Sequence, residues 1–156
     1  MQKRFIESLE FPIGEVNQAS SSEKGPGRPP FWEMVFWWTR KPLIGARAVI
    51  AASLLPEDVD AEKFKKMICL DKRSPHRYNP EIPPEWKKFF SGKKLLDPFA
   101  GFGNIPLEAL RLGLSATAVE LIPTARIFLK AVLEYPKRFG KHNSDTEIVE
   151  LKSVLN

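Results

Sequence analysis

The segment Asp97–Asn104 reads Asp-Pro-Phe-Ala-Gly-Phe-Gly-Asn and has the residue types best suited to hold a ligand. It follows a short apolar run, Lys94–Asp97, which we expect to be a buried strand. It precedes a helix expected from about Ile105 to Leu112. Two glycines let the backbone turn sharply and approach a ligand closely. The following helix would direct free N–H groups and its positive dipole end to the same place. The pattern predicts a ligand-binding turn at the carboxyl end of a strand.

A second acid, Glu120, stands 17 residues after Gly103. It ends the next expected strand, Ala116–Glu120, and the strand–helix–strand spacing predicts parallel pairing. In a doubly wound fold, an acid at that strand end lies beside the first turn and can accept two hydrogen bonds from a ribose diol. The turn and Glu120 together predict a nucleoside pocket.

The residues of the turn discriminate among cofactors. Pro106 stands where the dinucleotide fingerprint needs a third small residue, which argues against NAD and FAD. The chain has no Gly-Lys-Ser/Thr, which argues against a phosphate-binding loop for ATP. Asp-Pro-Phe-x-Gly-x-Gly with a glutamate at the second strand end is typical of the first motif of S-adenosylmethionine methyltransferases. The alternative is an ordinary turn with chance glycines.

The elements that must position this turn fall into three expected parts. We expect residues 1–92 to form a mainly helical module with a flexible loop at 18–30. We expect residues 93–136 to form a βαβα core. In the first part, an apolar segment precedes the loop and an aromatic block follows it. Further features are helices at 42–56, 57–70 and 84–90, a proline-rich connector at 74–84, a helix from Pro123 stopped by Pro136, and a tail or helix at 137–156.

Composition limits the class of protein. The 156 residues are 43% hydrophobic, which suits one compact domain. A single cysteine, Cys69, excludes a disulfide scaffold or a multi-cysteine metal site, and His76 and His142 are too scattered to suggest a metal site. No run approaches the roughly 18 apolar residues of a membrane span, and no secretory signal is visible, so we expect a cytoplasmic protein. Glu108 is expected to be exposed or in a salt bridge.

Positive charge gathers in residues 72–94, which hold seven basic and two acidic residues. The whole chain has a net charge of +5, so this stretch accounts for the excess. Aromatic residues alternate with the basic ones, and such a stretch could bind a nucleic-acid backbone. The alternative is a solvated surface with its aromatic rings turned inward.

Four segments between Arg4 and Arg138 resemble a known family. They are Phe11–Glu15, Trp37–Leu43, Leu96–Ala109 and Leu133–Pro136. They are similar to S-adenosylmethionine-dependent DNA amino-methyltransferases, in an archaeal and bacterial adenine-specific methylase-like branch with an N-terminal module. The resemblance implies an α/β, partial Rossmann-like class I methyltransferase fold with a helical N-terminal extension.

The resemblance also implies roles for individual residues. Glu120 would bind the ribose, and Leu121 or Ile122 would lie against adenine. Arg40, Lys41 and Pro42 would pack beside the pocket and help to hold the cofactor's carboxylate, as a cation can. The alternative is that Trp37 and Trp38 are ordinary core residues and Arg40 and Lys41 are solvated. The cofactor-binding set is completed by the turn, in which Asp97, Phe99, Gly101 and Gly103 surround the methionine part, with Pro98, Ala100 and Asn104.

An acceptor motif, Asp/Asn/Ser-Pro-Pro-aromatic, is expected in amino-methyltransferases to orient the target amino group and stack on the base. The nearest matches are 28–31 and 82–85, which start with arginine and isoleucine and so lack the polar acceptor. No catalytic residue is assigned. We expect the cofactor-binding half of a DNA adenine-N6 or cytosine-N4 methyltransferase that is inactive alone, whether a fragment, a split-enzyme subunit or a self-associating remnant. A non-catalytic cofactor- or partner-binding module, an RNA methyltransferase, and a small-molecule or protein methyltransferase stay open.

Overall fold

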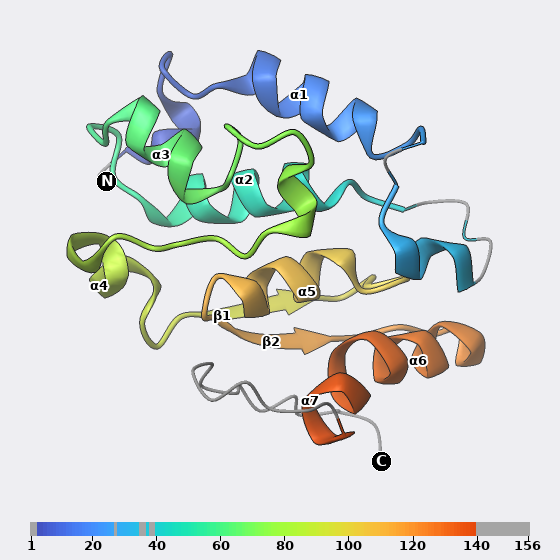
Figure 1. Cartoon of the computed structure of the whole chain (residues 1–156). Helices are drawn as coiled ribbons and strands as arrows, with labels where there is room; N and C mark the ends of the chain where they lie inside the picture. Colours follow the sequence, from blue (N-terminus) through green and yellow to red (C-terminus); the bar gives the residue numbers. More distant parts are fainter. Residues whose placement is uncertain (1–2, 27, 35–36, 38–39, 140–156) are drawn as a thin grey trace.

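The structure, a computed structural model, describes residues 3–26, 28–34, 37 and 40–139. It is a mostly helical α/β arrangement with a small parallel sheet (Figure 1). Single turns of 3₁₀-helix, labelled η, connect several of the elements. The helices and strands are α1 (Ile13–Ser22), α2 (Leu43–Leu54), α3 (Ala61–Met67), α4 (Lys87–Phe90), β1 (Lys94–Asp97), α5 (Asn104–Arg111), β2 (Ser115–Ala118), α6 (Pro123–Leu129) and α7 (Tyr135–Phe139). The short turns are η1 (Phe5–Glu7), η2 (Pro30–Met34), η3 (Pro75–Arg77) and η4 (Pro84–Trp86), and a π-helical turn, η5 (Lys130–Glu134), joins α6 to α7.

The sheet of the described residues consists of β1 and β2, which pair in parallel with Leu95 opposite Ala116. The strand predicted at Lys94–Asp97 is confirmed, but the expectation that it is buried is wrong, because only Asp97 is buried and Leu95 is half-buried. The second strand begins one residue earlier than expected and ends at Ala118, so Glu120 lies just beyond it. Leu95 and Ala116 pack into the core, whereas Leu96, which points to the other face, is 65% exposed. Among the described residues, one face of the sheet is therefore covered by the core, while Leu96 on the other face is largely uncovered.

The layers follow one another as α1, α2, α5 and the sheet (Figure 1). Helix α2 contacts α1 on one side and α5 on the other, and α5 contacts both strands. A single cluster of buried side chains runs from Phe5 through Ile44 and Phe64 to Leu112 and Ala116. The predicted N-terminal module and the βαβ segment thus share one hydrophobic core.

Helix α2 begins at Leu43 because a distant carboxylate caps it. Pro42 supplies no capping side chain. Instead, fully buried Glu23 accepts hydrogen bonds from the backbone N–H groups of Leu43 (2.7 Å) and Ile44 (2.8 Å). These N–H groups lack partners inside any helix, and a carboxylate also complements the positive end of the dipole. Burial is the main reason why the pKa of Glu23 is raised.

The loop expected at 18–30 is wrong for its first part, because residues 18–22 form the end of α1. The three consecutive serines belong to the helix, which ends at Ser22 and packs against α2. Glu23 and Pro29 are buried, so the chain here is packed against the protein. Sequence composition predicted a loop because serine, glycine and proline favour one locally, but packing on α2 decides the outcome.

Helix α3 is shorter than the predicted 57–70 segment and runs from Ala61 to Met67. Its first turn is capped by Asp60, whose side chain accepts a hydrogen bond from the backbone N–H of Lys63 at 2.6 Å. Its end is fixed by Cys69, which adopts φ +65°. The N–H of Leu70 reaches back to the carbonyl of Lys65 at 2.8 Å, the closing bond of a Schellman motif. A side-chain cap at the first end and a backbone reversal at the second therefore set this length.

Pro136 does not stop the last helix, contrary to expectation. Helix α6 continues through η5 into α7, which contains Pro136. Proline removes a backbone donor and crowds the preceding turn. The wider η5 turn, in which the N–H of Tyr135 donates to the carbonyl of Lys130, accommodates that change. The predicted tail contributes residues 137–139 to α7, and its remaining residues, 140–156, lie outside the described part. Within the described ranges, no helix has the length and hydrophobicity that a bilayer crossing requires.

Candidate functional site

The turn between β1 and α5 depends on two glycines. Gly101 has φ +52° and Gly103 has φ +88°, a region that other residues adopt only at a cost. A Cβ on Gly103 would lie 2.8 Å from Cδ2 of Leu129, and one on Gly101 would lie 3.3 Å from Nε1 of Trp37. The two glycines therefore allow the left-handed backbone conformation of the turn. They also allow α6 and Trp37 to approach the turn closely.

Two buried side chains of the turn keep acceptor atoms without a donor. Asp97 is 7% exposed, and its Oδ1 accepts from the N–H of Phe99 at 3.1 Å. Asn104 is 3% exposed, and its Nδ2 donates to the carbonyl of Lys41 at 2.5 Å. Among the described residues, neither Oδ2 of Asp97 nor Oδ1 of Asn104 has a hydrogen-bond partner. Since an unpaired buried acceptor costs about 1–3 kcal/mol, both atoms are suited to receive a donor from a ligand.

A pocket of about 140 Å³ opens on this turn. It brings together several residues predicted from sequence, and it adds Phe102 and Ile105, which sequence reasoning missed although both belong to the same segment. Its lining is Arg40, Lys41, Asp97, Phe99, Ala100, Gly101, Phe102, Asn104 and Ile105. We call it the turn pocket. The remaining predicted residues, Pro42, Pro98, Gly103, Glu120 and Leu121, lie outside this lining.

Glu120 nevertheless lies directly against the turn. Its Oε2 accepts from the N–H of Gly101 at 2.8 Å. Its Oε1 accepts from the N–H groups of Leu121 (2.8 Å) and Ile122 (3.1 Å). Hydrogen bonds from Ile122, then from Gly101 and Leu121, lower the pKa of Glu120. The carboxylate is thus held in place as an anion, and a carboxylate has about four acceptor positions, so capacity for a ligand hydroxyl is left.

Arg40 extends from the segment before α2 to the turn pocket. Its guanidinium lies over the rings of Phe102 (4.9 Å) and Trp32 (5.4 Å), a cation–π arrangement. Burial lowers the pKa of Arg40, but an arginine stays charged at neutral pH. Lys41 is exposed at the pocket's edge. The lining of the pocket therefore includes two cationic residues together with the acceptors of Asp97 and Asn104.

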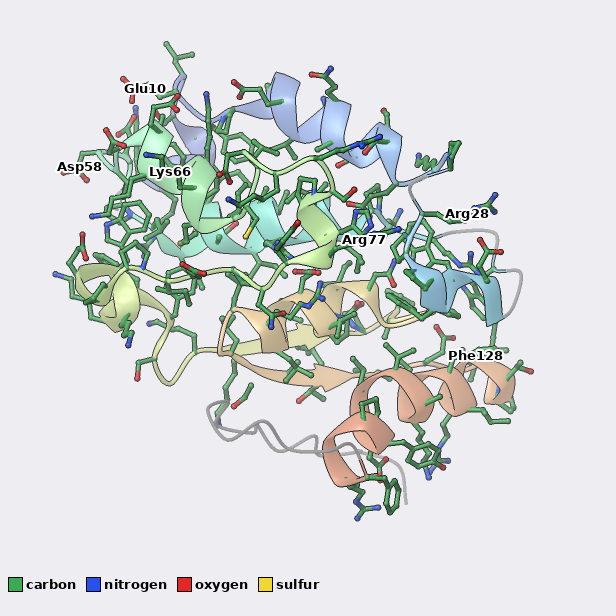
Figure 2. All side chains as sticks on the ribbon, in the orientation of Figure 1. Glu10, Arg28, Asp58, Lys66, Arg77 and Phe128 are labelled. Atoms are coloured by element: carbon green, nitrogen blue, oxygen red, sulfur yellow. The ribbon has the colours of Figure 1, made fainter. Side chains whose placement is uncertain are left out.

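Aromatic rings join the N-terminal part to the turn. Phe31 stacks on Phe102 with ring centres 5.7 Å apart, and Phe102 lies 5.4 Å from Phe128 of α6. Trp37 also contacts Phe128, edge to face at 6.3 Å. Figure 2 labels Phe128 on the side of the molecule toward which the strands point. Trp37 packs against the cluster that contains Phe102, while Trp38 lies outside the described residues.

Glu108 of α5 is the buried carboxylate at the centre of an ion-pair network. Both Glu108 and Arg47 are fully buried, and Oε2 of Glu108 lies 2.6 Å from Nε of Arg47. Arg111 donates to the same carboxylate at 2.8 Å. Arg47 also donates to the carbonyls of Ile68 and Pro75. Of the two predicted roles of Glu108, the salt bridge is the one observed, and its partner Arg47 was missed because it lies 61 residues earlier in the chain.

Comparison with known families gives one match, over part of the chain. Residues 10–74 match the family model DUF1156, described as a protein of unknown function. The matched range contains α1, α2 and α3 and ends before β1, so the turn pocket lies partly outside it. The comparison identifies no methyltransferase family. No curated protein and no solved structure matches the chain.

Proposed function

We propose that the chain binds S-adenosylmethionine at the turn pocket and forms the cofactor-binding part of a DNA adenine-N6 or cytosine-N4 methyltransferase. In this proposal β1, α5 and β2 are the first strand, first helix and second strand of a Rossmann-like class I methyltransferase fold. The observation that carries the proposal is the pair of buried acceptors, Oδ2 of Asp97 and Oδ1 of Asn104, in a pocket that also has cations.

The charged and polar groups of the turn pocket suit the amino-acid end of S-adenosylmethionine. A methionine moiety has an ammonium group, which donates hydrogen bonds, and a carboxylate, which accepts them. Asp97 and Asn104 offer the acceptors for the ammonium, and Arg40 and Lys41 offer cations for the carboxylate. A hydride-transfer cofactor or a nucleoside triphosphate would not use this combination.

The size of the pocket also favours the methionine part. A volume of about 140 Å³ is below the range of roughly 300–1,000 Å³ typical of whole small-molecule sites. The adenosine would then lie beyond the pocket, where Phe99 (88% exposed) and Leu121 (94% exposed) offer apolar surface. Glu120, which accepts hydrogen bonds from Gly101 and Leu121, keeps acceptor capacity for ribose hydroxyls.

The bound cofactor would supply an activated methyl group on its sulfonium, and the residues of this chain would hold and orient it. The two Pro-Pro segments do not provide the acceptor chemistry. Arg28 is exposed and paired with Glu33 at 3.1 Å, and Ile82 has no polar side chain. We therefore propose that the group that orients the target amine comes from another polypeptide segment, and that this chain alone does not transfer the methyl group.

Calorimetric titration of the 156-residue chain tests the proposal. S-adenosylmethionine should bind, and ATP and NAD should not. Asp97→Asn replaces a charged acceptor by a neutral one of the same shape and should weaken binding about 10- to 100-fold. Asp58→Asn is the matched control, because Asp58 is exposed and lies on the opposite side of the molecule from Phe128 in Figure 2.

Absence of heat with S-adenosylmethionine for the folded chain would overturn the cofactor proposal. An Asp97→Asn variant that binds as tightly as wild type would overturn the assigned role of Asp97. Methyl transfer to DNA by the purified chain without a partner would contradict the inference that the acceptor group lies elsewhere.

A further inference from the structure

Four lysines lie within eight consecutive residues at the start of the sheet. Lys87 and Lys88 belong to α4, and Lys93 and Lys94 follow a tight turn at Gly92, which has φ +68°. The turn is closed by a hydrogen bond of 3.1 Å from the N–H of Lys93 to the carbonyl of Phe90. All four side chains are on exposed residues. We call them the lysine cluster.

The charge of the lysine cluster is not neutralised by neighbouring acids. Glu85, the acid nearest in sequence, forms an ion pair with Lys63 of α3 instead. Lys88 lies over the ring of Phe89 at 5.0 Å. In the part of the chain that the structure describes, no carboxylate forms an ion pair with any of the four lysines. The four lysines are thus close together in the sequence and exposed to solvent.

Two aromatic residues of this stretch are buried, and the third, Phe89, is half-buried against the same core. Trp86 is 8% exposed and Phe90 is 2% exposed, and both belong to the main core. They are therefore not available for stacking on unpaired bases, which single-strand binders use. A membrane surface normally also receives exposed apolar side chains between the cations, and Trp86 and Phe90 are not available for that either. Exposed lysines beside aromatic rings that are mostly buried suit the phosphates of a nucleic acid.

The lysine cluster is remote from the turn pocket. Lys94 is the first residue of β1 and Asp97 is the last, a separation of about 10 Å along a strand. Figure 1 shows α4 on the side of the molecule away from the carboxyl ends of β1 and β2. A ligand held by the lysine cluster would therefore contact the opposite end of the sheet from the turn pocket.

We propose that Lys87, Lys88, Lys93 and Lys94 form a binding surface for the sugar-phosphate backbone of a nucleic acid, at the end of the sheet away from the turn pocket. The surface positions a nucleic acid through its phosphates and reads no base, because its contacts are point charges. This inference does not depend on cofactor binding at the turn pocket.

Fluorescence anisotropy with a short labelled DNA duplex tests the proposal. Four phosphate contacts predict a slope of about −3.6 in log affinity against log salt, which is a roughly 150-fold loss between about 50 and 200 mM. Replacement of the four lysines by glutamine should remove most of this slope and of the low-salt affinity. Single-stranded DNA and RNA of the same length, as parallel arms, show which nucleic acid the surface prefers.

A second fourfold variant controls for net charge. It makes the same change in charge at exposed residues elsewhere and should keep most of the wild-type affinity. Its substitutions are Lys3→Gln, Lys24→Gln, Lys66→Gln and Arg126→Gln. Lys66, labelled in Figure 2, lies on α3.

Three outcomes would overturn the proposal. One is equal loss of affinity in the two variants, which would show a general effect of net charge. Another is a lysine-cluster variant that binds DNA with the wild-type salt slope. The third is tighter binding to vesicles with anionic lipids than to any nucleic acid, which would indicate a membrane surface. Because unfolding would also abolish binding, circular dichroism and the denaturation midpoint must match wild type in both variants.

Discussion

Substitution of Gly103 by alanine tests two reasons why the turn needs a glycine, its left-handed backbone conformation and its close packing. The residue has φ +88°, and an added Cβ would lie 2.8 Å from Cδ2 of Leu129 and 3.4 Å from Cδ1 of Leu133. Both leucines are buried, so they have little room to move. Alanine therefore meets a conformational penalty and a steric one at the same position.

The two penalties have separate magnitudes. The left-handed conformation costs a non-glycine residue about 1–2 kcal/mol. Overpacking a buried site costs about 1–3 kcal/mol. Gly103→Ala should therefore lower the free energy of unfolding by about 2–5 kcal/mol. Gly92 (φ +68°) and Gly113 (φ +77°) are matched controls, because a Cβ on either would meet no atom within 4 Å, and alanine there should cost only the first, conformational penalty.

Urea denaturation followed by circular dichroism measures all three variants. The midpoints should fall in the order wild type, then Gly92→Ala and Gly113→Ala together, then Gly103→Ala, with unchanged m-values. A Gly103→Ala variant no less stable than the two controls would refute the close packing of α6 and η5 on the turn. A loss confined to Gly103→Ala, with both controls unaffected, would refute the conformational part of the reasoning.

Other substitutions test the buried charges and the pH dependence. Glu108→Gln leaves the fully buried Arg47 without its counter-charge and should cost about 3–5 kcal/mol of unfolding free energy, whereas the double variant Arg47→Met/Glu108→Leu should be less destabilised than Glu108→Gln. Glu23→Ala leaves two N–H groups of α2 without their acceptor and should cost about 2 kcal/mol or more, which thermal unfolding at neutral pH would measure. Because the pKa of Glu120 is lowered below its ordinary 4.5, its stabilising contribution is complete above that pH and is lost as the pH falls through the folded-state value. Glu120→Gln should therefore flatten the stability profile below pH 4.5, and an unchanged acid limb would contradict the hydrogen bonds assigned to this carboxylate.

The parts of the fold predicted from sequence depend on local information. The strand at Lys94–Asp97 and the turn that follows it were predicted because apolar runs and glycines act on their own backbone. Element ends were predicted less well. Helix α1 includes its three serines and packs on α2. Helix α7 includes Pro136, and the wider η5 turn before it accommodates the missing backbone donor. In both cases, tertiary packing or an adjacent helical turn overrides the local conformational preference of the residues, and neither can be read from the local sequence.

The site shows the same limit. Spacing alone placed Glu120 beside the turn, and the hydrogen bond from Gly101 confirms that proximity. The position of Arg40 and Lys41 at the pocket followed only from a family resemblance, because they lie far from Asp97 in sequence. Glu23 and Arg47 were not predicted at all. Their partners are 20 and 61 residues away, and no local pattern marks a long-range capping group or a buried ion pair.

The pairing of Arg47 with Glu108 has a consequence for how this chain can be divided. The segment that matches the family model, 10–74, contains the arginine, while the carboxylate belongs to α5. An excised 10–74 peptide would leave a guanidinium, fully buried in the whole chain, with no counter-ion. It would also lack Ala109, Leu112 and Leu114 from its share of the core. Residue 74 is thus the limit of a sequence match but not of the hydrophobic core, which continues into α5 and β2.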